Sequence, residues 1–205
     1  MKYSLKEMLS ILKSNKQNTL KLGDTMSFEL YTGEKVVAEI IGFNHDKIAG
    51  RKAKAKATFR FTIDGEFNMN DKWTNKGGWK NSKMRKVYCQ RLFKLLPEEL
   101  QAVIEEVEKE TTKGNASTEL VKTKDRLFLL SLTEAVGDDH YWSSYVKEGE
   151  QYELFKKKGY KFSKWSWLRS PNTSTTSTFY IVYSNGSYNY YFAYTTYGVC
   201  FAFAI

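Results

Sequence analysis

The stretch from Trp165 to Ile205 places the strongest constraint on what this chain can fold into and do. After Arg169 it contains no Lys, Arg, Asp, Glu, Gln, Met, Trp or His, and seven of the chain's 14 tyrosines lie between Tyr180 and Tyr197. A segment that is aromatic, polar and uncharged is atypical of a solvated tail and equally atypical of a plain core. We interpret it as a binding surface that the preceding residues hold in place.

Strand patterns run through this stretch on both sides of Asn185-Gly186. An Asn-Gly pair between aromatic, β-favouring runs is the strongest short hairpin signal, because both central residues of such a turn adopt positive φ. Residues 199–205 alternate large apolar side chains with small ones, which predicts a further strand. We expect an apolar frame to be buried, namely Phe179, Val182, Val199, Phe201 and Phe203.

Length and composition predict a single domain over residues 1–205. The chain is 41% apolar and 16% aromatic, which is enough for a core and argues against disorder. Residues 1–20 are expected to carry an N-terminal helix. Residues 137–164 look like an insertion between core elements, with a helix near 148–157, and residues 165–205 form the predicted ligand-binding region.

Apolar periodicity predicts the remaining elements. Ser4-x-x-Glu7 is a capping box, and the leucines that follow at helical spacing predict a helix over 4–14. The other expected elements are a hairpin of 26–31 and 35–43, a strand at 57–63, a helix from 81 or 82 to 95, a second helix from Pro97 to Val107, a polar loop at 111–118, and a buried strand or short helix at 126–130.

The formal charge of +9 is carried by residues 1–169. A basic balance favours nucleic acid or anionic surfaces as partners. The densest basic run, residues 51–56, has no interleaved aromatic residue, so a solvated loop and a contact with a polyanion both stay open. Cys89 and Cys200 are too few for a disulfide framework, and we expect buried thiols in a reducing compartment.

His45-Asp46 is a candidate catalytic or metal-binding pair. No second ligand cluster lies nearby in the sequence, and the other histidine, His140, has a different context. The alternative is a polar turn in which Asn44 and Asp46 bond the backbone. Motifs for a nucleophile with its base, for a phosphate loop and for zinc are missing from the sequence. We therefore expect no enzymatic activity, no metal and no cofactor.

A series of short motifs occurs in a fixed order along the chain: Leu22-Gly23-Asp24, Ile41-Gly42-Phe43-Asn44-His45-Asp46, Gly77-Gly78-Trp79-Lys80, Trp167-Leu168-Arg169-Ser170-Pro171 and Tyr197-Gly198-Val199. With these motifs, the chain from about residue 20 resembles a family of gut-bacterial and prophage proteins that look like C-type-lectin-fold domains. The resemblance implies an α+β fold of mixed, mostly antiparallel strands with two or three flanking helices.

Many such proteins resemble the variable proteins of diversity-generating retroelements, in which an error-prone reverse transcriptase rewrites adenines near the 3′ end of the gene. Changing the first two bases of Asn codons reaches Tyr, Ser, Thr, Phe, Ile, Ala and Gly, but not Lys, Glu, Gln, Met or Trp. Residues 172–197 contain only reachable types. A fixed Tyr- and Ser-rich binding face would have the same composition, so a non-diversified lectin-fold binding or structural module of a phage or bacterium is the alternative.

The resemblance also implies roles for single residues. Arg169 is expected to be a buried scaffold charge held by backbone carbonyls or a carboxylate. Tyr offers rigid contact area and Ser and Asn offer adaptable hydrogen bonds, as in antibody loops. The expected ligand-facing positions, predicted to share one exposed face, are Ser166, Asn172, Thr175, Ser177, Thr178, Tyr180, Ile181, Tyr183, Tyr188, Asn189, Tyr190, Tyr191, Tyr194 and Thr195.

The ligand implied by the resemblance is a protein or glycan on a cell surface. Calcium-dependent sugar binding is not expected, because no carboxylate side chain follows Glu153. Nucleic acid is a less favoured partner, and an oligomer is left open. The sequence has no signal-peptide pattern and no apolar run of about 18 residues, so we expect no membrane span and a location in the bacterial cytoplasm or a phage virion.

Overall fold

The computed structural model describes residues 1–138, 146–157, 162 and 164–205. The architecture is α+β with mostly antiparallel strands, as expected. The strands are β1 (Lys2–Ser4), β2 (Thr25–Glu29), β3 (Lys35–Phe43), β4 (Ala57–Thr62), β5 (Val107–Thr112), β6 (Leu120–Asp125), β7 (Phe128–Leu129), β8 (Ser166–Pro171), β9 (Thr178–Val182), β10 (Tyr188–Phe192) and β11 (Gly198–Ala204). The α-helices are α1 (Leu5–Lys13), α2 (Gly78–Asn81), α3 (Gln90–Leu95), α4 (Glu98–Gln101) and α5 (Leu132–Val136), joined by a 3-10 helix (Gln17–Thr19) and a π-helix (Met84–Cys89).

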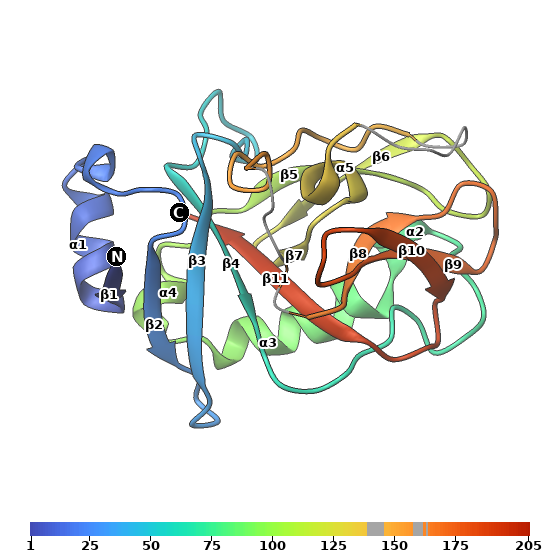
Figure 1. The fold of residues 1–205 in the computed structure, drawn as a ribbon, viewed down its shortest axis with the longest axis horizontal. Coiled ribbons are helices and arrows are strands. Elements are labelled where there is room, and N and C mark those ends of the chain that lie inside the picture. The colour runs from blue at the N-terminus through green and yellow to red at the C-terminus, as the bar shows by residue number, and fades with distance from the viewer. Residues whose placement is uncertain (139–145, 158–161, 163) are drawn as a thin grey trace.

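One large sheet runs through the molecule. Among the described residues it has nine strands in the order β1-β2-β3-β4-β11-β8-β9-β10, with β7 pairing to β11 off this path. Strand β11 is antiparallel to β4 and parallel to β8. Figure 1 shows α1 at one end of the molecule and the β8–β10 group at the other. Residues 172–197 therefore form an excursion between two strands that are neighbours in the sheet.

The N-terminal helix and the first hairpin confirm the sequence prediction. Ser4 accepts a hydrogen bond from the amide of Glu7, and the Glu7 carboxylate accepts one from the amide of Ser4. Such an N-cap contributes about 1 kcal/mol. The apolar stripe of α1 is buried against the sheet, and strands β2 and β3 pair antiparallel beside it.

Aromatic side chains on β4 and β11 fill the centre of the core. Phe203 lies opposite Phe59 with ring centroids 5.4 Å apart, and Phe201 lies opposite Phe61 at 5.9 Å. Each such pair adds about 0.5–1.5 kcal/mol beyond area burial. The predicted apolar frame is confirmed, since Phe179, Val182, Val199, Phe201 and Phe203 are all buried.

The helix expected from residue 81 or 82 to 95 is confirmed, because helical backbone runs from Lys83 through the π-helix and α3 to Leu95. At the start of this helix, the Ser82 hydroxyl accepts a hydrogen bond from the amide of Arg85 at 3.1 Å. The second expected helix, from Pro97 to Val107, is shorter than predicted. Pro97 does precede a helix, but α4 ends at Gln101 and Val107 opens strand β5. Glu105 donates its amide to the carbonyl of Ala204, so sheet pairing overrides the helical stripe. The result, within the described residues, is five short α-helices in place of two or three.

The polar loop expected at 111–118 is only partly observed, because Thr111 and Thr112 close β5 and a β5–β6 hairpin surrounds the loop. The prediction of a helix near 148–157 is wrong, because this segment consists of turns, bends and irregular backbone. Its amides bond elsewhere, Tyr152 to the carbonyl of Glu134 and Leu154 to that of Ile41. Part of the expected insertion, including His140, lies outside the described residues.

Both cysteines are free and buried, and burial raises the pKa of each thiol. The basic run begins as an exposed loop, with residues 51–54 all exposed. In the ranges that the structure describes, no helix is long and apolar enough to cross a membrane.

Candidate functional site

Strand β9 anchors the hairpin that carries most of the candidate residues. All five of its residues are buried, because it lies between β8 and β10 and both its faces are covered. The turn to β10 confirms the predicted hairpin: Gly186 donates its amide to Tyr183 O at 3.0 Å, and Tyr183 donates to Ser187 O at 2.7 Å. Only Gly186 has positive φ, at 87°; Asn185 does not, contrary to expectation, and its side chain instead accepts from the amide of Ser187.

Five of the expected ligand-facing residues are buried, so the prediction of exposure is wrong for them. Strands β8 and β9 are interior strands of the sheet, and their side chains pack on both sides. Tyr180, for example, packs edge-on against Tyr188 and Tyr190, and burial raises its pKa to about 12. The buried residues are Ser166, Asn172, Thr178, Tyr180 and Ile181.

The other nine candidates are partly or fully exposed, but they do not share one face. Successive side chains of a strand point to opposite sides of the sheet. Tyr190 of β10 packs with Tyr180 on one side, whereas Tyr191 meets Tyr183 on the other. The exposed or half-buried candidates are Thr175, Ser177, Tyr183, Tyr188, Asn189, Tyr190, Tyr191, Tyr194 and Thr195.

Trp73, Phe192 and Tyr194 form an exposed group that we term the first aromatic cluster. Their exposed fractions are 61%, 37% and 44%. The Trp73 ring lies 4.2 Å from Phe192 and 5.8 Å from Tyr194, while the Phe192 and Tyr194 rings are nearly parallel. Trp73 was not predicted as a site residue. A lone Trp in the polar segment 69–78 was the only sequence signal.

Trp165, Tyr183, Tyr191 and Tyr197 form the second aromatic cluster. The Trp165 ring lies 4.5 Å from that of Tyr183, and the Tyr191 ring lies 4.9 Å from that of Tyr197. The hydroxyls of Tyr183 and Tyr191 are 3.2 Å apart, and Asn189 donates its amide to Tyr183. Burial and the hydrogen bond with Tyr191 raise the pKa of Tyr183, so the Tyr183 phenol stays a neutral donor and acceptor at neutral pH.

The loop before β9 is held by one buried side chain from elsewhere in the chain. The Asn75 amide nitrogen donates to the carbonyls of Asn172, Thr175 and Thr178 at 3.3, 3.0 and 2.9 Å. The Asn75 carbonyl oxygen accepts from the amide of Asn115 at 2.7 Å. This clamp fixes the backbone of residues 172–178 without using their side chains.

Arg169 confirms the prediction of a buried scaffold charge. It is fully buried, and its five N–H donors reach the Glu134 carboxylate, Thr111 and the carbonyls of Leu129 and Glu110. Burial by itself would raise the pKa of Glu134, but the charges of Arg169 and Lys109 outweigh it and hold that pKa at about 2. The group fastens β8 to α5 and β5.

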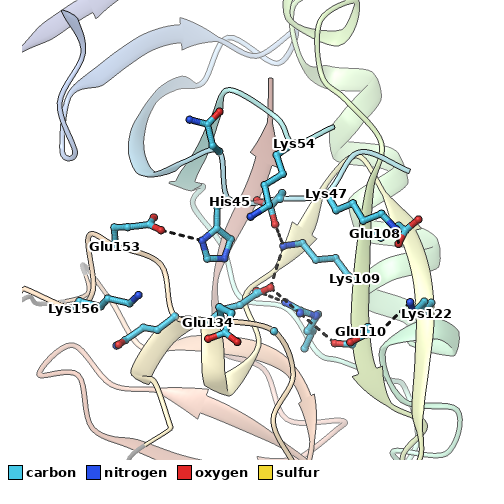
Figure 2. Close-up of a pocket in the computed structure, with 16 residues that line it drawn as sticks. His45, Lys47, Lys54, Glu108, Lys109, Glu110, Lys122, Glu134, Glu153 and Lys156 are labelled. Carbon is cyan, nitrogen blue, oxygen red and sulfur yellow. Dashed lines mark hydrogen bonds and ion pairs between the residues drawn. The ribbon is translucent and has the colours of Figure 1, made fainter. Parts of the chain in front are cut away.

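Asp46 extends this buried network, so the expected bonding of its side chain to the backbone is wrong. Its carboxylate accepts hydrogen bonds from Lys109, Tyr152 and Thr58. His45 stacks on Tyr152 with ring centroids 4.0 Å apart, and its Nδ1 lies 3.4 Å from the Glu153 carboxylate. Figure 2 shows His45, Lys109, Glu134 and Glu153 among the residues that line a pocket, whose volume is about 500 Å³. Among the described residues, no group of His, Cys, Asp and Glu has the arrangement of a metal site.

Comparison with known proteins gives one finding. The family model described as Domain of unknown function (DUF6273) matches residues 50–205, from the β3–β4 connection through β11. No curated protein and no solved structure matches the chain. The matched range includes both aromatic clusters, Asn75 and Arg169.

Proposed function

We propose that this chain, which belongs to the DUF6273 family, is a ligand-recognition protein whose binding surface is formed by the first aromatic cluster. The observation that carries the proposal is the first cluster, in which Trp73, Phe192 and Tyr194 contact one another and stay exposed. Aromatic side chains left together at a surface indicate an interaction site. Indole and phenol rings are also the side chains most enriched in binding hot spots.

The way these rings are supported favours recognition over a merely apolar surface. Hairpin β9–β10 has a fully buried inner strand, and Asn75 clamps the preceding loop. A binding surface held this way loses little conformational freedom when its ligand docks.

The same proposal includes a C-type-lectin-like fold and diversification by a retroelement. Supporting it are the α+β architecture and the restriction of residues 172–197 to amino acids reachable from Asn codons. In such a system, side chains would vary between the fixed strands β8 and β11. The DNA flanking the gene tests this part: it should contain a reverse-transcriptase gene and a near-copy of the 3′ end with adenines at the differing positions. Without both, diversification is excluded.

Binding is tested with fluorescently labelled protein and a panel of whole bacterial cells, read by flow cytometry. The double variant Trp73→Ala/Tyr194→Ala should bind at least about tenfold more weakly than the wild type, because hot-spot aromatics dominate binding energy. The matched control is Tyr31→Ala, which removes an equally exposed aromatic ring from the β2–β3 turn. Equal losses in the two variants would rule out the first aromatic cluster as the binding surface.

The alternative is a non-diversified binding module that uses the same surface. Closely related strains would then carry identical segments over residues 165–197, and the cell-binding result would be unchanged. Sequencing the gene from such strains separates the two forms of the proposal.

A further inference from the structure

A further pocket, which we term the α2 pocket, lies between α2 and the hairpin of β5 and β6. Its volume is about 610 Å³, within the range of about 300–1,000 Å³ typical of small-molecule sites. None of the residues of the first aromatic cluster lines it. The pocket in Figure 2 is lined by as many carboxylates as cationic side chains, whereas the charged side chains that line the α2 pocket are all lysines.

Close backbone contacts join the two segments that line the α2 pocket. Gly78 and Gly114 both have positive φ, at 52° and 72°. A Cβ on Gly78 would collide with the carbonyl oxygen of Thr112, and a Cβ on Gly114 would collide with the next segment, so only glycine fits at either position. Asn75 bridges the segments: its backbone carbonyl accepts from the amide of Gly78 at 2.9 Å, and its side-chain oxygen accepts from the amide of Asn115 at 2.7 Å. The two walls of the pocket are therefore held at a fixed separation.

Every polar side chain that lines the α2 pocket can donate a hydrogen bond, and none is negatively charged. The donors are the ammonium groups of Lys76, Lys80 and Lys113 and the carboxamides of Asn81 and Asn115. The remaining side chain in the lining, that of Val121, is apolar. Such a lining suits a ligand group that accepts hydrogen bonds and carries a negative charge.

Two of the three lysines have no counter-charge within the fold. Lys113 forms an ion pair with Glu119, which does not itself line the pocket. Lys76 and Lys80 are exposed, and neither forms an ion pair with any residue in the part of the chain that the structure describes. Because both line one pocket, their like charges repel each other unless an anion lies between them.

We propose that the α2 pocket binds the phosphate group of a small phosphorylated molecule through Lys76 and Lys80. A phosphate monoester carries close to two negative charges at neutral pH, which matches the two uncompensated ammonium groups. Lysine binds phosphate as a point charge, and the carboxamides of Asn81 and Asn115 can donate to further phosphate oxygens. A phosphate group fills only part of the pocket, so the molecule that carries it can lie along Val121 and the methylene stems of the lysines.

The test is an NMR titration with inorganic phosphate that follows the backbone amide resonances of Gly77 and Gly114, both of which line the pocket. The pH is held at about 7.5, where phosphate is mostly a dianion, and phosphate replaces chloride at fixed ionic strength. The wild type should give a saturable shift. The double variant Lys76→Ala/Lys80→Ala should bind phosphate about tenfold or more weakly, because charge-assisted hydrogen bonds are lost. Both lysines are exposed, so the resonances of the buried sheet should stay in place.

The matched control is Lys72→Ala/Lys86→Ala, which removes the same two charges from neighbouring exposed positions that do not line the pocket. Its affinity for phosphate should equal that of the wild type. A shift that grows linearly without saturation overturns the proposal. So does an equal loss in the two double variants, since only the net charge would then matter.

Two further probes identify the ligand group. Acetate carries a single charge and should bind at least about tenfold more weakly than phosphate, and equal affinities for the two anions would overturn the assignment to phosphate. Glycerol 3-phosphate, a phosphate monoester, should bind at least as tightly as inorganic phosphate. Failure of this ester to give a saturable shift would overturn the proposal in favour of a site for free phosphate.

Discussion

Replacing Glu134 by Gln tests whether the buried charge network stabilises the fold. The carboxylate is buried and contacts both Arg169 and Lys109, and these charges hold its pKa at about 2 against an ordinary value of 4.5. The difference of 2.5 between these values, at about 1.4 kcal/mol for each pKa unit, corresponds to about 3 kcal/mol. Gln keeps the shape and can still serve the capping box with Ser131, so the change isolates the charge.

The pH dependence gives a second, sharper readout. Because the pKa of Glu134 is lower in the folded state, its contribution is fully present above the unfolded value of 4.5 and is lost as the pH falls toward about 2. Urea unfolding followed by tryptophan fluorescence should therefore show a wild-type advantage of about 3 kcal/mol at neutral pH. That advantage should fall to about half near pH 3.

The control is Glu150→Gln, which removes an exposed carboxylate that pairs with Lys147. Its cost should stay within about 0.5 kcal/mol, as for most exposed ion pairs. If Glu134→Gln costs no more than Glu150→Gln, or if its cost does not change between neutral pH and pH 3, the stabilising role of the network is refuted.

Three further variants test the backbone geometry. Gly78→Ala should destabilise the protein by several kcal/mol in urea unfolding, because the φ of Gly78 is positive and a Cβ there would lie 2.2 Å from Thr112 O. Gly33→Ala is the control: Gly33 also has positive φ but faces open space, so this change should cost only about 1 kcal/mol. Similar costs for the two variants would contradict the close approach of Thr112 to Gly78. Asn75→Ala should speed the amide hydrogen exchange of residues 172–178 and leave that of α1 unchanged. Equal exchange rates of residues 172–178 in the wild type and the variant would mean that Asn75 does not clamp the loop.

Local patterns predicted much of the fold. The capping box at Ser4, the β2–β3 and β9–β10 hairpins and the apolar alternation of β11 were all visible in the sequence, because each depends on neighbouring residues. The wrong predictions concern segments whose secondary structure is determined by pairing with distant parts of the chain. Val107 continues a helical stripe in the sequence, but its strand pairs with β6 and bridges to Ile48.

The sequence indicated which segment carries most of the candidate site, but not which of its side chains are exposed or which distant residues join them. Composition identified residues 165–205, yet it cannot distinguish an edge strand from an interior one, and so Tyr180 and Ile181 were expected at the surface. Trp73 was missed because its partners, Phe192 and Tyr194, are far away in the sequence. The burial of Arg169 was predicted correctly from the resemblance, whereas its partner Glu134 had no sequence signal beyond a capping pattern.

The central position of β11 has a consequence for synthesis on the ribosome. Strand β4 pairs with β11, and Arg60 lies close to Cys200 although 140 positions separate them. While β11 is still inside the exit tunnel, β4 and β8 both lack their shared neighbour, and the apolar faces of Phe59 and Phe61 stay open. The nascent chain therefore completes its core only after residues 172–197 have emerged, so every side chain in that segment is present before the fold closes around it.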